Sequence, residues 1–134
     1  MRKRAVAAAF WIIGVFVAVT FAGDRPVRQW AVVYLSEPTL IGSTIVQGPV
    51  LFTHDDAKMA RGERCTTVQL VEPGKGPIEE IAAFHCIPVR RGIVHKFTLR
   101  TRPNSELGLG CVLLEYQFAG DAEGHGVPTS TYAH

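Results

Sequence analysis

The segment Arg64–Arg102, RCTTVQLVEPGKGPIEEIAAFHCIPVRRGIVHKFTLRTR, decides the predicted fold, because apolar runs alternate in it with turn residues. Its first run, Cys65–Val71, leads into a turn rich in glycine and proline. The runs Glu80–Ile87 and Ile93–Arg100 follow, joined by a short linker. Short β-forming runs separated by such turns predict a three-stranded antiparallel meander.

The register of this meander follows from its apolar pattern, since a slip of one residue would turn a whole strand to the wrong face. Matching apolar to apolar positions across the second hairpin places His85 opposite His95 on the inner face. The same reasoning in the first hairpin places Thr66 opposite His85 on the inner face and Cys65 opposite Cys86 on the outer face. One register therefore predicts both a histidine pair and a cysteine pair.

The rest of the chain adds more short runs. We expect strands at Trp30–Leu35, Ser43–Gln47, Val50–His54 and Leu109–Phe118. Val50, Phe52 and His54 share one face of their strand, and the inner face of the last strand carries Val112, Leu114, Tyr116 and Phe118. A helical turn is expected over residues 55–62, with Asp55 or Asp56 as its N-cap. The tail over residues 119–128 is too rich in glycine to predict regular structure. Six or seven short strands predict an all-β fold, either a small antiparallel β-sandwich or a partly open barrel.

The N-terminal segment has the pattern of an export signal. Met1–Arg4 is basic and Ala5–Ala22 is almost wholly apolar, so we expect a signal peptide or an uncleaved membrane-anchor helix over residues 1–22. Residues 23–29 are then a linker, residues 30–128 the β-domain and residues 129–134 a disordered tail. A cleaved signal and an uncleaved anchor both place the domain outside the cytoplasm, in the periplasm or the extracellular space. An uncleaved segment would anchor it to the inner membrane through residues 5–22.

The charge balance argues against nucleic acid as a partner. Beyond the N-terminal segment, residues 23–134 hold eleven Lys and Arg residues against twelve Asp and Glu residues. A nucleic-acid-binding domain needs a basic surface that this composition does not supply. The remaining length suits one small domain with a single core.

The chain has three cysteines. If it is exported, as we expect, it reaches an oxidising compartment in which disulfides persist. The hairpin register predicts a disulfide between Cys65 and Cys86, which would stabilise a small domain by roughly 3 kcal/mol. Cys111 is left as a free thiol. It can serve as a small buried hydrophobe, an intermolecular linker or a ligand, and the first role is the commonest.

The histidines are the strongest candidates for chemistry. The chain has no Cys-x-x-Cys pair, no phosphate-binding glycine loop and no His-Glu-x-x-His motif. His85 and His95, predicted to face each other, are the first candidate ligands, His54 ends an apolar strand, and His125 can fold back from the tail. Imidazole suits zinc or copper, so these four residues form a predicted metal site.

Three functions remain open from the sequence. The favoured one is a noncatalytic module that binds an unknown protein or small-molecule ligand, with each histidine simply hydrogen-bonded at the rim of the core. The alternative is a zinc- or copper-binding protein, with a hydrolase or redox activity as one form of it. A redox couple of Cys65 and Cys86 is less favoured, because neither cysteine lies in a Cys-x-x-Cys motif at a helix start.

Overall fold

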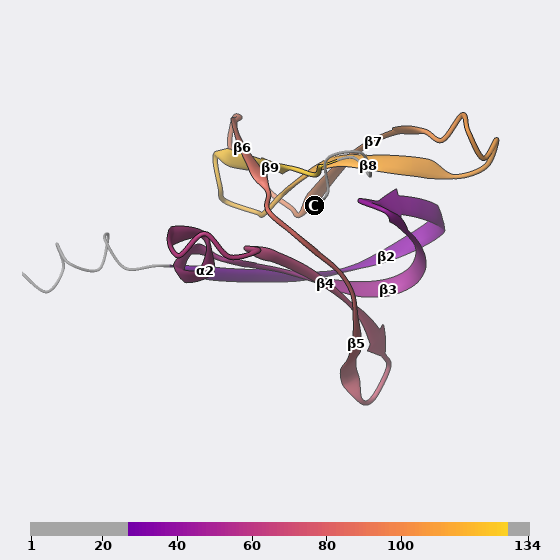
Figure 1. Cartoon of the computed structure of the whole chain (residues 1–134), viewed down its shortest axis with the longest axis horizontal. Coiled ribbons are helices and arrows are strands. Elements are labelled where there is room, and N and C mark those ends of the chain that lie inside the picture. The colour runs from indigo at the N-terminus through magenta and orange to yellow at the C-terminus, as the bar shows by residue number, and fades with distance from the viewer. Residues whose placement is uncertain (1–26, 129–134) are drawn as a thin grey trace, which may run out of the picture.

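A computed structural model describes residues 27–128, which form eight strands and one short helix (Figure 1). The elements in chain order are β2 (Arg28–Ile41), β3 (Thr44–Asp55), α2 (Asp56–Ala60), β4 (Thr66–Glu72), β5 (Gly76–Phe84), β6 (Ile87–Arg90), β7 (Thr98–Pro103), β8 (Cys111–Gln117) and β9 (Glu123–Gly126). The all-β prediction is confirmed. The predicted N-terminal helix and the predicted disordered tail lie outside the described residues. Among residues 27–128, no helix has the length and apolarity needed to cross a bilayer.

All eight strands belong to one mixed sheet that does not close on itself. Its order is β5-β4-β3-β2-β8-β9-β6, with β7 also paired to β8. Two layers face each other in Figure 1, one built from β2 to β5 and the other from β6 to β9. Only a short parallel pairing, Thr39 and Leu40 against Cys111 and Val112, links the two layers within the sheet.

The β2–β3 hairpin is longer than the sequence pattern suggests. We predicted that the first strand ends at Leu35, but β2 continues to Ile41 past a shift in register between Leu35 and Thr39. Pro38 lies in this shift, where its missing N–H is tolerated because the ladder is already interrupted. The far end of the hairpin curls toward β8 in Figure 1. The irregularity therefore lets one strand serve both layers.

The predicted meander is only half right. β4 and β5 pair as an antiparallel hairpin, but Thr66 lies opposite Phe84 where we predicted His85, and two further register shifts follow. The second hairpin is absent from the described sheet, since β6 pairs with β9 and β7 pairs with β8. Alternation within a run shows which face is buried, but it does not identify the partner strand.

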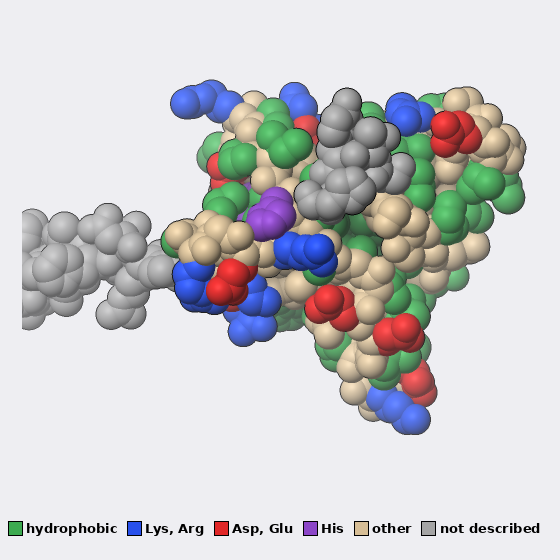
Figure 2. Space-filling view, in the orientation of Figure 1, with side chains coloured by type: hydrophobic (Ala, Val, Ile, Leu, Met, Phe, Trp, Pro, Cys, Tyr) green, Lys and Arg blue, Asp and Glu red, His purple; other side chains and the backbone are tan. Residues whose placement is uncertain are grey.

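The β4–β5 hairpin extends away from the two layers. Figure 2 shows acidic side chains along it and a basic group at its tip. Its charged residues, all exposed or half-buried, are Glu72, Lys75, Glu79 and Glu80. This hairpin is therefore solvated over much of its length, in contrast to the strands that hold the core.

The core fills the space between the two layers. Phe52 from β3 and Tyr116 from β8 are fully buried, and their ring centroids lie 5.2 Å apart. Phe97 packs against Phe52, with centroids 5.3 Å apart, although residues 91–97 form no strand. The prediction for the inner face of the last strand needs one correction, because Leu114 is 40% exposed whereas its neighbour Leu113 is buried.

The tail that we expected to be irregular contains β9. Its order comes partly from Gln117, whose side-chain amide donates hydrogen bonds to the carbonyl oxygens of Gly92 and Asp121 at 2.8 and 2.6 Å. These bonds fix two loops next to β9. The strand itself lies between β8 and β6, so both of its edges are paired.

Gly124 allows β9 to approach an ion group centred on the buried carboxylate of Glu115. The Glu115 carboxylate binds Arg91 at 2.6 Å and Arg100 at 3.0 Å, and the guanidinium of Arg91 lowers the pKa of Glu115. A Cβ atom at position 124 would lie 2.0 Å from Oε2 of Glu115. Only glycine fits there without moving a carboxylate held by two arginines.

We expect Gly124→Ala to destabilise the protein by roughly 1–3 kcal/mol, because the added methyl group must displace the Glu115 carboxylate. Urea denaturation of the variant and the wild type measures this difference. Gly92→Ala is the matched control, since a Cβ atom at position 92 meets no atom within 4 Å. Equal losses in the two variants would show that steric contact with Glu115 is not the cause.

Candidate metal centre

His54 reaches the core from the end of β3. Val50, Phe52 and His54 alternate along the buried face of this strand, as the sequence predicts, and His54 is 1% exposed. The chain then turns into α2, where the Asp55 side chain accepts hydrogen bonds from the N–H groups of Ala57 and Lys58. This helix cap, which the sequence also predicts, ends the strand directly after His54.

Cys86 lies in the two-residue connection between β5 and β6 and is buried. Its Sγ atom is 3.0 Å from Sγ of Cys65, which directly precedes β4. The backbone N–H of Cys86 also donates to Sγ of Cys65, at 3.4 Å. The β4–β5 hairpin brings these two residues together because they flank its open end.

His125 is held at the centre of β9. It lies opposite Tyr116 of β8 and Pro88 of β6 in the ladder, and it is 1% exposed. The imidazole stacks on the Tyr116 ring with centroids 4.9 Å apart, and the Phe118 ring meets it edge-on at 5.9 Å. The pairing of the backbone on both sides and the packing of the aromatic rings therefore restrict the orientation of the His125 side chain.

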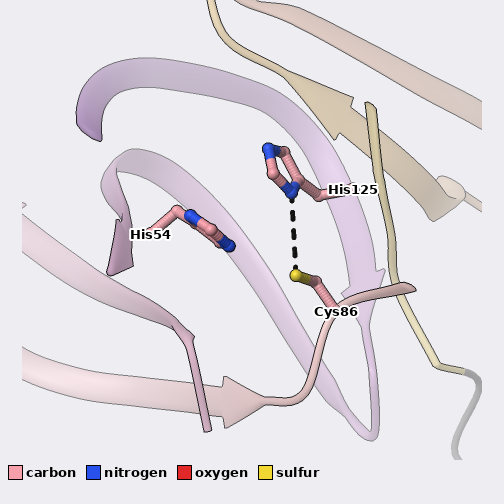
Figure 3. Close-up of side chains that lie close together, drawn as sticks. All are labelled: His54, Cys86 and His125. Atoms are coloured by element: carbon pink, nitrogen blue, oxygen red, sulfur yellow. Dashed lines mark hydrogen bonds between the residues drawn. The ribbon is translucent and has the colours of Figure 1, made fainter. Parts of the chain in front are cut away.

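His54, Cys86 and His125 converge on one point between the layers (Figure 3). Each offers one donor atom, and the three donor atoms all lie within 4.8 Å of one another. The two imidazole centroids are 4.3 Å apart, and Nδ1 of His125 is 3.6 Å from Sγ of Cys86. Two nitrogens and one sulfur thus surround a common centre.

The imidazoles of this cluster are not satisfied by hydrogen bonds. Both ring nitrogens of His54 and Nε2 of His125 are buried without a hydrogen-bond partner. Buried polar atoms are nearly always paired in folded proteins, and each unpaired one costs about 1–3 kcal/mol. The sequence-based alternative, in which each histidine is simply hydrogen-bonded in the core, does not describe these atoms. Coordination to a cation would occupy nitrogen lone pairs.

Burial keeps the cluster uncharged at neutral pH. It lowers the pKa of His125 to about 4, and the nearby His54 contributes to the shift. It also lowers the pKa of His54, an effect that Asp56 partly offsets. Burial and the Cys65 thiol raise the pKa of Cys86. Both imidazoles therefore carry free lone pairs at neutral pH, whereas Cys86 must lose a proton before it can bind a metal.

Asp56 connects the cluster to the surface. Its Oδ1 atom is 3.4 Å from Nδ1 of His54, in a geometry outside that of a hydrogen bond. The same residue lines an open pocket of about 350 Å³ together with the acidic residues Asp121 and Glu123. Three acidic side chains therefore line an open pocket, and one of them, Asp56, lies beside His54.

The structure divides the four histidines predicted as ligands into two pairs. His54 and His125 lie together in the cluster, but His85 and His95 are exposed and lie outside it. The predicted facing of His85 and His95 is wrong, because it depended on the hairpin register and on a second hairpin that the described sheet lacks. Sequence reasoning also missed Cys86 as a candidate ligand, since it assigned this residue only to a disulfide or a redox couple with Cys65.

The three cysteines are thiols in the structure. Cys65 and Cys86 adjoin each other, but both are buried, whereas we predicted them on the outer face. Their sulfurs, 3.0 Å apart, are not joined, so the disulfide stays a prediction. Cys111 is buried at the start of β8, where its Sγ atom lies 3.5 Å from the Thr39 hydroxyl oxygen.

This arrangement suits a transition metal more than a hard cation. Imidazole nitrogen and thiolate sulfur are the donors that zinc and copper prefer, whereas calcium and magnesium require oxygen ligands. A carboxylate near the outer nitrogen of a ligating histidine is a common arrangement around such ions. No protein-family model matches the chain, and neither does any curated protein or solved structure.

We expect the metal-free protein to lose stability as the pH falls from 6.5 toward 4. The unfolded chain protonates His125 near the ordinary histidine pKa of 6.5, whereas the folded protein resists protonation until about pH 4. Unfolding therefore takes up protons in this range and becomes easier. One pKa unit corresponds to about 1.4 kcal/mol, so the loss from His125 approaches about 3 kcal/mol.

Urea denaturation in the presence of chelator, repeated at several pH values, measures this dependence. His125→Gln is the informative variant, because its side chain does not titrate, and His95→Gln is the exposed control. A pH dependence that is as steep in His125→Gln as in the wild type would contradict the assignment to His125.

Proposed function

We propose that this protein is a noncatalytic metal-binding module that holds one transition-metal ion between His54, Cys86 and His125. The observation that carries the proposal is the convergence of three buried donor side chains within 4.8 Å, with unpartnered imidazole nitrogens among them. An ion would supply the interaction that these nitrogens lack. Complete burial of both imidazoles favours retention of the ion over its presentation to a substrate.

The donor set favours copper or zinc. Two histidines and one cysteine form the trigonal ligand set of copper electron-transfer sites, and zinc binds the same atoms in tetrahedral sites. Metal–ligand bonds of about 2.0–2.3 Å hold two donor atoms roughly 3.3–3.8 Å apart in a tetrahedral site. The 3.6 Å between Nδ1 of His125 and Sγ of Cys86 already lies in this range. An intense visible band from thiolate to copper would distinguish copper(II) from colourless zinc.

The acidic pocket supports a route for the ion. Asp56 lines this pocket and also lies beside His54, so a cation attracted by Asp56, Asp121 and Glu123 would arrive next to the first ligand. On loading, the Asp56 carboxylate can accept a hydrogen bond from Nδ1 of His54 and direct Nε2 toward the ion.

The interaction role predicted from the sequence is compatible with this proposal. Trp30, Val32 and Tyr34 alternate along one face of β2 and are 68%, 54% and 69% exposed. Exposed aromatic residues on one face are typical of surfaces that contact another molecule. Export also stays a prediction, because residues 1–22 lie outside the described part of the chain.

We expect the reduced protein, purified without chelator or stripped and reloaded with Zn²⁺, to hold stoichiometric metal by elemental analysis. His54→Gln and Cys86→Ser should reduce the metal content to background, because each variant removes one of three ligands. His85→Gln and His95→Gln are matched controls, since both histidines are exposed. Metal-free wild type under all these conditions, or equal losses in the exposed controls, would overturn the proposal.

Asp56→Asn should weaken zinc binding by roughly 10-fold, because a carboxylate that orients a ligating histidine typically contributes this much. Competition with a chromophoric chelator measures the affinity. Glu63→Gln, which removes an exposed carboxylate paired with Arg61, is the control for overall negative charge. Equal affinities for Asp56→Asn and the wild type would show that Asp56 does not orient His54.

A further inference from the structure

Cys65 is a thiol beside the cluster that metal binding does not use. It is 3% exposed, and its Sγ atom lies 3.0 Å from Sγ of Cys86. It is not among the residues whose donor atoms converge within 4.8 Å. Two sulfurs this close are already inside the usual contact distance of nonbonded sulfur atoms. The Cys65 sulfur thus adjoins a metal ligand but lies to one side of the ion's position.

We infer that Cys65 makes the metal site redox-sensitive: oxidation joins it to Cys86 in a disulfide, and this disulfide excludes the ion. The inference rests on the proposed function, since it assigns Cys86 as a ligand. The thiolate lone pairs of Cys86 can bind a metal only while its sulfur is not bonded to Cys65. Metal-bound dithiol and metal-free disulfide are therefore alternative states of one site.

The oxidation is balanced with hydrogen peroxide as the oxidant. One cysteine thiolate attacks peroxide, the O–O bond breaks, and a sulfenic acid and water result. The second thiol then attacks the sulfenic sulfur, which forms the S–S bond and releases the oxygen as a second water. Two thiols thus lose two protons and two electrons, and peroxide accepts them. Reduction by an external dithiol restores both thiols.

The local geometry favours this second step over competing ones. Cys65 and Cys86 flank the open end of one hairpin, so their approach requires no rearrangement of strands. Cys111, the third cysteine, is not part of the core cluster that contains Cys65 and Cys86. It lies against Thr39 of β2. It is therefore an internal control for thiol oxidation that does not touch the metal site.

The test uses Zn²⁺ as the probe, because zinc has no redox chemistry of its own. Full-length wild type, Cys65→Ser and Cys111→Ser are reduced, stripped of metal and divided into two portions, one of which receives a limiting dose of peroxide. Zinc is then added to both. Elemental analysis gives the bound zinc, and intact mass after thiol alkylation gives the disulfide.

We expect reduced wild type, reduced Cys65→Ser and reduced Cys111→Ser to bind zinc equally. Peroxide should abolish zinc binding by wild type and Cys111→Ser in proportion to the disulfide formed, and dithiothreitol should restore it. Cys65→Ser should still bind zinc after the same peroxide dose. In the reverse order of addition, bound zinc should slow formation of the disulfide in wild type.

The outcomes separate the two proposals. If none of the reduced proteins binds zinc, the proposed metal site fails. If they all bind zinc but fully disulfide-bonded wild type retains it, only the redox inference is overturned. If reduced Cys65→Ser binds no zinc while reduced wild type does, Cys65 is a ligand and the inference is also overturned. Equal zinc loss from oxidised Cys65→Ser and oxidised wild type would overturn it as well.

Discussion

The packing of Phe52 against Tyr116 is the contact on which the rest of the structure depends. These fully buried rings come from opposite layers, which share only a short parallel pairing within the sheet. Such an aromatic pair contributes about 0.5–1.5 kcal/mol beyond the burial of its surface. His54 lies two residues beyond Phe52 on the same strand face, and His125 stacks on Tyr116. The contact that joins the layers therefore also sets the distance between the two imidazoles.

The same core makes the cluster costly when it is empty. Apolar and aromatic neighbours exclude water from His54 and His125, and they offer no acceptor or donor to the unpartnered nitrogens. An apolar pair at these positions would pack without this cost. A bound metal ion would offset the cost of burying two imidazoles and a thiol in such surroundings.

The sequence predicts part of the site for sound physical reasons. Alternation along Val50–His54 correctly turned His54 inward, because a strand with one buried face leaves no other arrangement. His125 was only a candidate, because three glycines around it suggested irregular structure. β9 is nevertheless ordered by pairing on both edges and by Gln117, and neither influence is visible in local composition. Pairing with strands distant in the sequence therefore determines whether such a segment forms regular structure.

Cys86 shows a different limit. The apolar pattern brought it close to Cys65, but the predicted register was wrong by one residue at this end of the hairpin. It placed His85 on the inner face, whereas His85 is exposed. The predicted register assumed a regular ladder, and the hairpin contains two shifts that break this regularity. A small error in strand alignment is tolerable for fold class, but it is decisive for a ligand set.

The parallel joint between β2 and β8 has a consequence for how the molecule forms. It brings together residues 72 positions apart, such as Thr39 and Cys111, and Cys86 meets His125 across 39 positions. Contacts of such long range slow folding, because much chain entropy is lost before they form. The β2–β5 layer can assemble from local hairpins, whereas the ligand set requires the second layer. Metal capture would therefore follow the assembly of both layers, and the ion would stabilise a fold that is already formed.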